Sequence, residues 1–553
     1  MIYRLKLCAV ALALALCAAA RFGGPAAQAA RQQAQAPSAT AAQPTAAAPD
    51  AARPLTPQER RGRSIYLRGE SPAGRPITAV IGEVDVPATA MTCAGCHGLR
   101  GEGKTEGGVT AGNLTWSNLT KPYGHTHPSG RKHGAFTESS VIFSITNGVD
   151  PDKNDLNVAM PRFKMATEDM ADLLAYLKRI EFDRDPGISA DRIEIATILP
   201  AAGPLAEMGA AMRDVLAAYF EEINSRGGIY SRKINLRVVD AGGGGAAAAA
   251  RARAAIAQGQ VFAFVGGVSA GADAELGALA REEEVPFIGP STLTPQPGTP
   301  PNRYVFYLAP GVGEQSRALV NFASERLSMK KPRASIVLAQ GALTEAAAAA
   351  VEDQAKQAGW GVVARRAYAP SGFDAARLAA DLKREGAEAV FFFGPGAEQA
   401  AFIKSADALG WTPTIFSLGV LAGGDLPAAV PASFKEKIFL AFPSVPSDVT
   451  PEGKRDFLAL TEKYKLPSKH SAAQLSALAA AKTFVEGLKL SGSDVSREKL
   501  ITSLEGLYDF DTGVTPRLIF GPNRRVGAAG AHVVTINPET KEFAAVGGWV
   551  KSY

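Results

Sequence analysis

Cys93-Ala94-Gly95-Cys96-His97 is the stretch of this chain of 553 residues that most narrowly restricts its fold and its chemistry. Two thiols at this spacing can reach the two vinyl groups on one edge of a porphyrin, and the next residue then places its imidazole beneath the iron. A redox CxxC pair would follow a strand in a βαβ unit, whereas this chain continues into a glycine-rich segment at 98–103. The motif therefore predicts one covalently attached haem c, bound by Cys93 and Cys96, with His97 as an axial ligand of the iron.

A second axial ligand is needed if the iron is to carry electrons without binding other molecules. Met160 is followed by Pro161, which places it in a loop, and a helix with an apolar inner face at 170–180 comes next. We expect Met160 to be the partner of His97, because a His/Met pair fills both axial positions and raises the reduction potential relative to two histidines. The alternatives are Met165, His125, His127 and His133.

Further residues support this interpretation along 58–180. They are Gly62, Tyr66, Gly98, Pro161 and the closing segment Leu174-Ala175-Tyr176-Leu177. With the attachment motif, they make this part of the chain resemble a class I cytochrome c domain. The resemblance implies an all-α domain whose first and last helices pack together through small and aromatic residues. In that family a proline after the motif often supplies the carbonyl that binds the proximal histidine. No clear counterpart is found here, so the partner of the second nitrogen of His97 stays open.

The first residues predict export. A basic start is followed by an apolar run at 7–20, too short to span a bilayer, and by a small-residue cleavage site at Ala27-Gln28-Ala29. A lipoprotein signal ending at Cys17 is the alternative, which is disfavoured because Leu16 stands where a small residue is usual. We therefore expect residues 1–29 to be a signal peptide and the mature protein to lie in the periplasm.

Length and composition indicate several folded units. Residues 30–55 are rich in Ala, Gln, Pro and Thr without apolar periodicity, which predicts a disordered tether. The cytochrome-like domain is expected at 56–182, a linker at 183–191 and a second domain at 192–553. The apolar fraction of 46% is typical of globular protein, and the net charge of +5 gives no reason to expect nucleic acid as a partner.

From residue 192 onward, short apolar segments alternate with amphipathic or alanine-rich helical ones. The expected strands lie at 193–199, 234–239, 261–265, 286–288, 335–339, 362–367, 389–393 and 438–442. Because most of them are separated by helical stretches, the pattern predicts doubly wound parallel sheets covered by helices on both faces.

Several short motifs follow one another along this second domain, and each occurs once. They are Leu199-Pro200, Ile223-Asn224-Ser225-Arg226-Gly227-Gly228-Ile229, Val265-Gly266-Gly267, Val285-Pro286-Phe287-Ile288, Asp509-Phe510-Asp511-Thr512-Gly513 and Phe520-Gly521-Pro522-Asn523. Their order and spacing resemble a type I periplasmic binding protein of the branched-chain amino-acid class. The resemblance implies two α/β lobes that close on a ligand about a hinge. We expect one lobe at 192–312 plus 444–507 and the other at 313–443 plus 508–553.

The ligand of such a domain is expected at the carboxyl ends of the strands. The candidate ligand-binding residues there are Ser269, Ala270, Ser291, Thr292 and Gly396. In relatives that bind amino acids, hydroxyls of the first lobe and an acid and an aromatic of the second hold the zwitterion. Here Leu293 stands where a threonine is usual, and Gly396 and Gly419 stand where the aromatic and the acid would be. The resemblance therefore implies a small organic ligand that is not a classical α-amino acid.

Three functions fit these features. The leading one is a periplasmic electron carrier coupled to a ligand-binding domain, with a periplasmic dehydrogenase, for instance a quinoprotein, as redox partner. The second is the solute-binding component of an ABC transporter that serves a membrane permease and uses the haem as a redox sensor. The third, an oxidoreductase acting on the bound ligand, is disfavoured because no second cofactor motif and no catalytic set is found, so we do not expect an enzyme.

Overall fold

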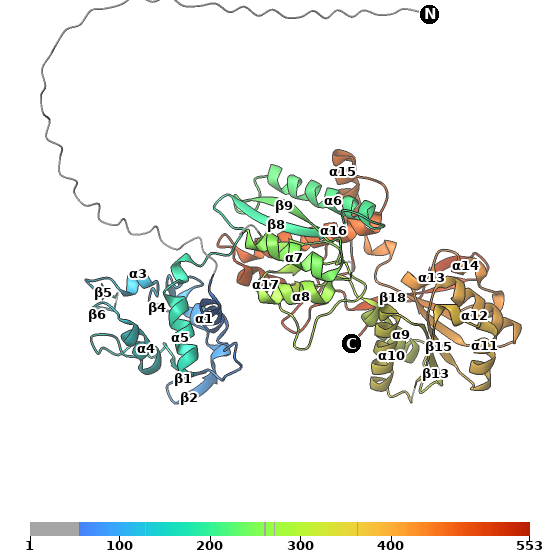
Figure 1. Cartoon of the computed structure of the whole chain (residues 1–553), viewed down its shortest axis with the longest axis horizontal. Helices are drawn as coiled ribbons and strands as arrows, with labels where there is room; N and C mark the ends of the chain where they lie inside the picture. Colours follow the sequence, from blue (N-terminus) through green and yellow to red (C-terminus); the bar gives the residue numbers. More distant parts are fainter. Residues whose placement is uncertain (1–54, 128, 259–260, 270, 362) are drawn as a thin grey trace, which may run out of the picture. The chain divides into compact units, whose positions relative to one another are not determined.

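The structure is a computed structural model that describes residues 55–127, 129–258, 261–269, 271–361 and 363–553. The expected signal peptide, the expected tether up to residue 54 and the candidate ligand residue Ala270 lie outside the described residues. The chain divides into two compact units between Asp183 and Arg184 (Figure 1). Each unit has apolar core residues of its own.

The first unit combines helices with short antiparallel strands. Its helices are α1 (Pro57–Arg68), α2 (Cys93–His97), α3 (Trp116–Leu119), α4 (Glu138–Asn147) and α5 (Thr167–Leu177), with 3-10 turns at Ala88–Ala90 and Ile180–Phe182. Its strands are β1 (Thr78–Ile81), β2 (Val84–Pro87), β3 (Lys104–Glu106), β4 (Val109–Ala111), β5 (His125–Thr126), β6 (Lys132–His133) and β7 (Arg162–Lys164). They pair in the order β2-β1-β7 and as the hairpins β3-β4 and β5-β6. The expected all-α domain thus also contains short strands. One reason is local, since Gly107 and Gly108 both have positive φ and form a tight hairpin turn.

Helices α1 and α5 pack against each other, as the resemblance to cytochromes c implied (Figure 1). Gly62 permits this approach, because a Cβ atom there would lie 2.0 Å from the carbonyl oxygen of Asp172 on α5. The rings of Tyr66 and Tyr176 are buried in the same contact, with centroids 5.7 Å apart. The small residue and the two aromatic rings therefore hold the ends of this unit together.

The first lobe of the second unit is built on a parallel sheet in the order β12-β11-β10-β8-β9. Its strands are β8 (Arg192–Leu199), β9 (Lys233–Asp240), β10 (Ala263–Val265), β11 (Phe287–Ile288) and β12 (Val305–Phe306). Its helices are α6 (Ala206–Ser225), α7 (Gly245–Ala257), α8 (Asp273–Glu282), α15 (Pro451–Tyr464), α16 (Ser471–Ser491) and α17 (Arg497–Glu505). Their inner faces share one core with the strands.

The second lobe has a larger sheet in the order β14-β13-β15-β16-β17-β18-β19, with β20 paired to β18. The strands are β13 (Ala334–Ala339), β14 (Ala364–Tyr368), β15 (Ala389–Phe393), β16 (Thr414–Leu418), β17 (Ile438–Phe442), β18 (Gly530–Asn537), β19 (Glu542–Ala545) and β20 (Val550–Lys551). The helices are α9 (Val312–Glu325), α10 (Ala342–Gln357), α11 (Ala375–Arg384), α12 (Gly396–Ala408), α13 (Gly419–Ala422) and α14 (Leu426–Ala429), with 3-10 turns at Pro370–Gly372, Ala432–Phe434 and Pro446–Asp448. Strand β13 shows why apolar side chains occur on both of its faces. Ile336 and Leu338 belong to the core with α9 and α10, while Val337 belongs to the core with α11 and α12.

The chain returns to the second lobe later than the sequence analysis expected, which placed this boundary at residue 508. Leu518, Phe520 and Val526 are buried in the core of the first lobe. The ring of Phe520 stands edge-on to Phe306 of β12, with centroids 5.3 Å apart. The segment therefore completes the first lobe, and the second resumes at β18.

The junction between the two units is short. Asp183 accepts hydrogen bonds from the Arg63 guanidinium at 2.9 Å and the Tyr176 hydroxyl at 2.8 Å, both within the first unit. Asp185 accepts one from the backbone N–H of Arg497 at 2.6 Å, within the second. Only Arg184 separates these two anchored residues. Among the described helices, none is both long and apolar enough to cross a membrane.

Candidate haem site and ligand-binding loops

The attachment motif forms the single-turn helix α2. The Thr92 side chain caps it by accepting a hydrogen bond from the backbone N–H of Gly95 at 3.2 Å. Gly98 ends the turn with φ of 82°, a conformation that favours glycine. The Tyr66 hydroxyl donates to the carbonyl of Gly98 at 2.7 Å, so α1 fixes the end of the motif. Burial raises the pKa of Tyr66, which keeps this hydroxyl protonated as a donor.

The second nitrogen of His97 has a partner that the sequence did not reveal. Nδ1 lies 2.7 Å from the carbonyl oxygen of Gly112, just after β4. A proton on Nδ1 that is donated to this carbonyl leaves the lone pair on Nε2, the nitrogen that ligates a metal. No sequence signal marks Gly112, because any residue at that point of the backbone would present the same carbonyl group.

The opposite nitrogen of His97 is left without a partner. Nε2 is buried and has no hydrogen-bond partner among the described residues. Burial lowers the pKa of His97, and the hydrogen bond to Gly112 opposes this effect. A buried, unprotonated and unpaired imidazole nitrogen is costly in a protein interior unless it binds something. An iron ligand is the chemical role that this nitrogen fits.

A cavity of about 220 Å³ opens beside this nitrogen. Cys93, Cys96 and His97 all line it. The two thiols are free, and burial raises the pKa of Cys93 to about 12, so this thiol stays protonated. The apolar walls of the cavity include Leu114, Leu119, Val141, Ile145, Phe163, Leu173 and Leu177. The residues present therefore fit haem c, with free thiols, an unpaired imidazole and an apolar pocket in one place.

The structure also separates the candidates for the second axial ligand. Met160 lines the same cavity as His97, whereas Met165 lines a separate small one between α1 and β7. His125, His127 and His133 reach the main cavity from the β5-β6 hairpin. Both ring nitrogens of His133 are engaged, Nδ1 at 2.7 Å from the Gly134 carbonyl and Nε2 at 3.0 Å from Nε2 of His127.

In the second unit, the hydroxyls of two first-lobe candidates, Ser291 and Thr292, contact protein groups. Ser269 is buried beside Ser291, whose hydroxyl lies 2.9 Å from that of Ser476 on α16. The Thr292 hydroxyl accepts a hydrogen bond from the backbone N–H of Thr294 at 3.0 Å. Ser476 was not among the sequence candidates, since it lies far along the chain and no motif marks it.

In the second lobe, two glycines leave no room for larger side chains. A Cβ at Gly396 would lie 1.9 Å from the carbonyl oxygen of Ala422, and one at Gly419 would lie 2.4 Å from the ring of Phe442. An acid nevertheless lies nearby, which the sequence analysis missed. The Tyr368 hydroxyl, at the end of β14, donates to the carboxylate of Glu398 in the first turn of α12. The sequence signal that could have pointed to Glu398 is its position two residues after Gly396.

The fold and these sites define a unit with a cavity that fits haem c, followed by a two-lobed α/β domain. Residues 88–181 match the cytochrome c family, and residues 192–541 match the family described as periplasmic binding protein. The second match covers more than half of the chain. The chain belongs to the periplasmic binding protein family and carries a cytochrome c domain before the binding domain.

Relatives with curated names share the binding domain. The Leu/Ile/Val-binding protein BraC3 of Rhizobium johnstonii is 24% identical over 58% of this chain and 86% of its own length. The Leu/Ile/Val-binding protein homolog 3 of Brucella melitensis is 26% identical over 37% of this chain, and the match spans 55% of the relative's length.

Solved structures share the fold. A branched-chain amino acid ABC transporter protein of Thermus thermophilus, with bound valine, is 19% identical, with a TM-score of 0.51 over 65% of this chain and 97% of that one. A fatty acid ABC transporter substrate-binding protein of Thermomonospora curvata is 20% identical, with a TM-score of 0.50 over 67% and 95%. At these identities the likeness concerns the fold alone.

Proposed function

We propose that the protein is a periplasmic electron carrier whose haem c unit is coupled to a small-molecule binding domain. In this proposal Cys93 and Cys96 attach the haem, and His97 and Met160 are its axial ligands. The observation that carries it is the buried, unpaired Nε2 of His97 in a cavity that it shares with both thiols and Met160. The proposal includes export by a signal peptide at 1–29 and the domain limits 56–182 and 192–553.

A haem with His and Met ligands takes up and releases one electron and offers no open position to oxygen or peroxide. The chain's own residues prepare the site for it. The carbonyl of Gly112 sets the tautomer and the orientation of His97. The Tyr66 hydroxyl holds the backbone at Gly98, and the apolar walls of the cavity exclude water.

The direct test is purification of the full chain after export with the c-type maturation machinery. We expect a haem that stays with the polypeptide on a denaturing gel and a reduced spectrum typical of a low-spin c-type cytochrome. Replacement of Cys93 and Cys96 by alanine should abolish attachment. A protein that carries no covalent haem under these conditions would refute the electron-carrier function.

For the binding domain we propose a small ligand with a carboxylate or hydroxyl group. Relatives are named for leucine, isoleucine and valine, but this chain has glycine at both Gly396 and Gly419, where no side chain fits. The nearby acid Glu398 already accepts a hydrogen bond from the hydroxyl of Tyr368. Ser269, Ser291 and Thr292, on the first lobe, remain the proposed contacts. A thermal-shift screen of small acids, alcohols and amino acids on the holoprotein tests this class.

The second candidate function is solute delivery to a membrane permease, with the haem as redox sensor. It is favoured by the match of residues 192–541 to the periplasmic binding protein family. The two candidates differ in their partners. Reduction of the holoprotein by a periplasmic dehydrogenase, such as a quinoprotein, favours electron transfer. Ligand-dependent binding to permease subunits favours delivery.

A further inference from the structure

The turn that carries Met160 has little packing of its own to hold it. Residues 157–159 are exposed, and Val158 is 85% exposed. Two hydrogen bonds shape the turn. The backbone N–H of Ala159 donates to the Asn157 side chain at 2.9 Å, and that of Met160 donates to the Asn157 carbonyl at 2.9 Å. Both bonds lie within the turn, and a segment with so few buried contacts opens at little cost in free energy unless something else holds it.

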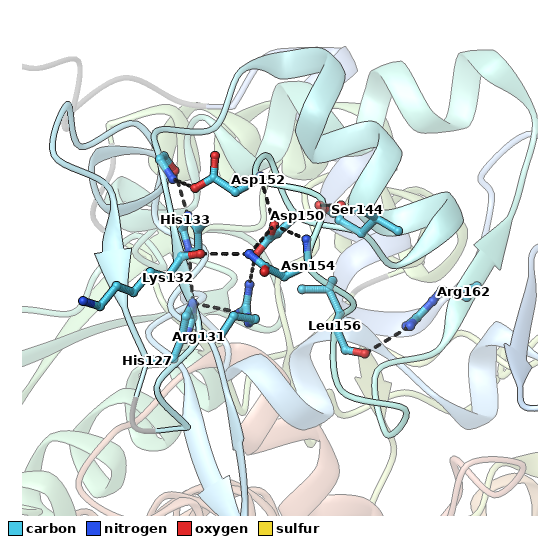
Figure 2. A network of polar contacts seen from close by, with 12 residues as sticks. His127, Arg131, Lys132, His133, Ser144, Asp150, Asp152, Asn154, Leu156 and Arg162 are labelled. Carbon is cyan, nitrogen blue, oxygen red and sulfur yellow. Dashed lines mark hydrogen bonds and ion pairs between the residues drawn. The ribbon is translucent and has the colours of Figure 1, made fainter.

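The chain on either side of this turn is fixed. The buried carboxylate of Asp150 accepts a hydrogen bond from the backbone N–H of Asn154 at 2.9 Å (Figure 2). The backbone N–H of Leu156 donates to the carbonyl of Gly148 at 2.8 Å. On the other side, β7 begins at Arg162 and pairs with β1. The turn therefore connects two fixed anchors.

The guanidinium of Arg162 closes the turn from outside the cavity. Its neighbour Phe163 is buried and lines the cavity, whereas Arg162, on the other side of β7, does not. The guanidinium donates to the carbonyl of Met160 and, through its other amino group, to the carbonyl of Leu156 at 3.4 Å (Figure 2). These two carbonyls lie at the two ends of the turn. The planar fork of an arginine can bind both of them at once.

Gly148 makes room for this guanidinium. It ends α4 with φ of 72°, in the left-handed region that favours glycine. A Cβ at Gly148 would lie 1.6 Å from Nε and 1.8 Å from Cζ of Arg162. The guanidinium therefore lies directly against the backbone of Gly148, where any side chain would displace it.

We propose that Arg162 is a positioning residue for the second axial ligand, and that it holds the Met160 thioether toward the iron by tying both ends of the turn together. The inference rests on the proposed function, in which Met160 is that ligand. A thioether ligand raises the reduction potential, which means that it binds reduced iron more strongly than oxidised iron. A loosened turn should therefore release Met160 first in the oxidised protein.

The test compares the oxidised holoprotein with Arg162→Gln, whose single amide cannot replace the fork. The matched control is Lys164→Gln, which removes a positive charge from the same side of the same strand, where the ammonium pairs with the exposed Asp85 at 3.0 Å. The weak near-infrared band of the bond between methionine sulfur and iron is followed on heating, beside far-UV circular dichroism. Reduction potentials are measured, and imidazole, which must displace Met160 to bind the iron, is titrated into each protein.

In the wild type and Lys164→Gln we expect the band to persist until the dichroism reports unfolding. In Arg162→Gln the band should disappear at temperatures where the dichroism is unchanged, and the potential should be lower. Imidazole should bind Arg162→Gln about tenfold or more tightly than the wild type, because its apparent affinity rises with the fraction of protein in which the turn is open.

A band, potential and imidazole affinity of Arg162→Gln equal to those of the wild type would overturn the proposal. So would a band that disappears together with the dichroism, since Arg162 would then stabilise only the fold. If Arg162→Gln does not fold, Gly148→Ala takes its place and should release the band early.

The control for Gly148→Ala is Gly82→Ala, at a glycine with φ of 60° where a Cβ would meet nothing within 4 Å. Equal behaviour of these two variants would also overturn the proposal. Failure of the proposed function is distinguishable. A wild type with covalent haem but no band refutes Met160 as the ligand, and the role of Arg162 with it, whereas a protein without covalent haem refutes the electron carrier.

Discussion

At the scale of single residues, His97 shows how the surroundings distinguish the two nitrogens of one imidazole ring. One nitrogen is bound to the carbonyl of Gly112, and the other is buried and unpaired. The same imidazole on an open surface would be protonated by small changes in pH and hydrated on both sides. Here burial and one hydrogen bond leave a single nitrogen free for the iron of the proposed haem.

Met160 and Met165 make a matched pair for testing the second ligand. Met160→Ala should abolish the weak near-infrared sulfur-to-iron band of the oxidised holoprotein and lower its reduction potential, because the thioether ligand is lost. Met165→Ala should keep both, since its side chain lines a different cavity. Spectroscopy and potentiometry of the two variants decide the assignment. Survival of the band in Met160→Ala and its loss in Met165→Ala would contradict it.

The residues of the binding loops predict weak or absent binding of leucine, isoleucine and valine. No carboxylate is placed at Gly396 or Gly419 to pair with the ammonium group, and a buried unpaired charge costs several kcal/mol. Calorimetric titration of the holoprotein with each amino acid measures this directly. Micromolar affinity for any of the three would show that another group, with Glu398 as the first to examine, holds the ammonium.

At the scale of elements, the contact of α1 with α5 depends on the absence of a side chain at Gly62. Gly62→Ala would bring a Cβ to 2.0 Å from the backbone of Asp172, which cannot rotate away. We expect the helices to separate and the first unit to lose about 1–3 kcal/mol of stability, as in other overpacked cores. Thermal unfolding followed at the haem band measures the loss.

The control for this change is Gly313→Ala, at a glycine of α9 where a Cβ would meet nothing closer than 3.5 Å. Alanine favours the helix there and costs nothing in packing, so the second unit should be unchanged or slightly more stable. Equal destabilisation by both substitutions would mean that the loss at Gly62 does not come from the α1–α5 contact.

At the scale of the whole molecule, each unit has its own core, so the binding domain should fold without haem. A fragment of residues 184–553 should be monodisperse and melt cooperatively in circular dichroism. A fragment that starts at residue 192 lacks the hydrogen bond of Asp185 to Arg497 and the packing of Gly187 against Phe262, and should melt at a lower temperature. Aggregation of the longer fragment would imply that the units depend on a shared core.

The short junction motivates a prediction about coupling. Only Arg184 lies between residues anchored in the two units, so the covalent connection between them is short. We expect a bound ligand to change the reduction potential, and by linkage the redox state to change ligand affinity by the same factor. Potentiometry with ligands from the thermal-shift screen, and reduction by a dehydrogenase in their presence and absence, measure this. An unchanged potential and rate would leave an electron carrier whose two halves act independently.

The sequence by itself determined the features that contiguous residues encode. The attachment motif at 93–97 predicts the haem because both thiols and the imidazole lie within one turn of chain. The apolar periodicity from residue 192 predicted the doubly wound lobes, because burial on two faces leaves a readable pattern in every strand. The order of motifs along the chain was enough to identify both families.

The tertiary structure alone decided the contacts between distant segments. The sequence cannot single out the backbone carbonyl of Gly112, because every residue has a backbone carbonyl. Glu398 and Tyr368 meet only because β14 and β15, which flank β13, end at the same edge of the sheet. Residues 518–526 return to the first lobe because their apolar side chains complete its core, at a sequence distance that no local pattern records. Such contacts depend on which surfaces the folded chain brings together, and that follows from packing of the whole rather than from any stretch of residues.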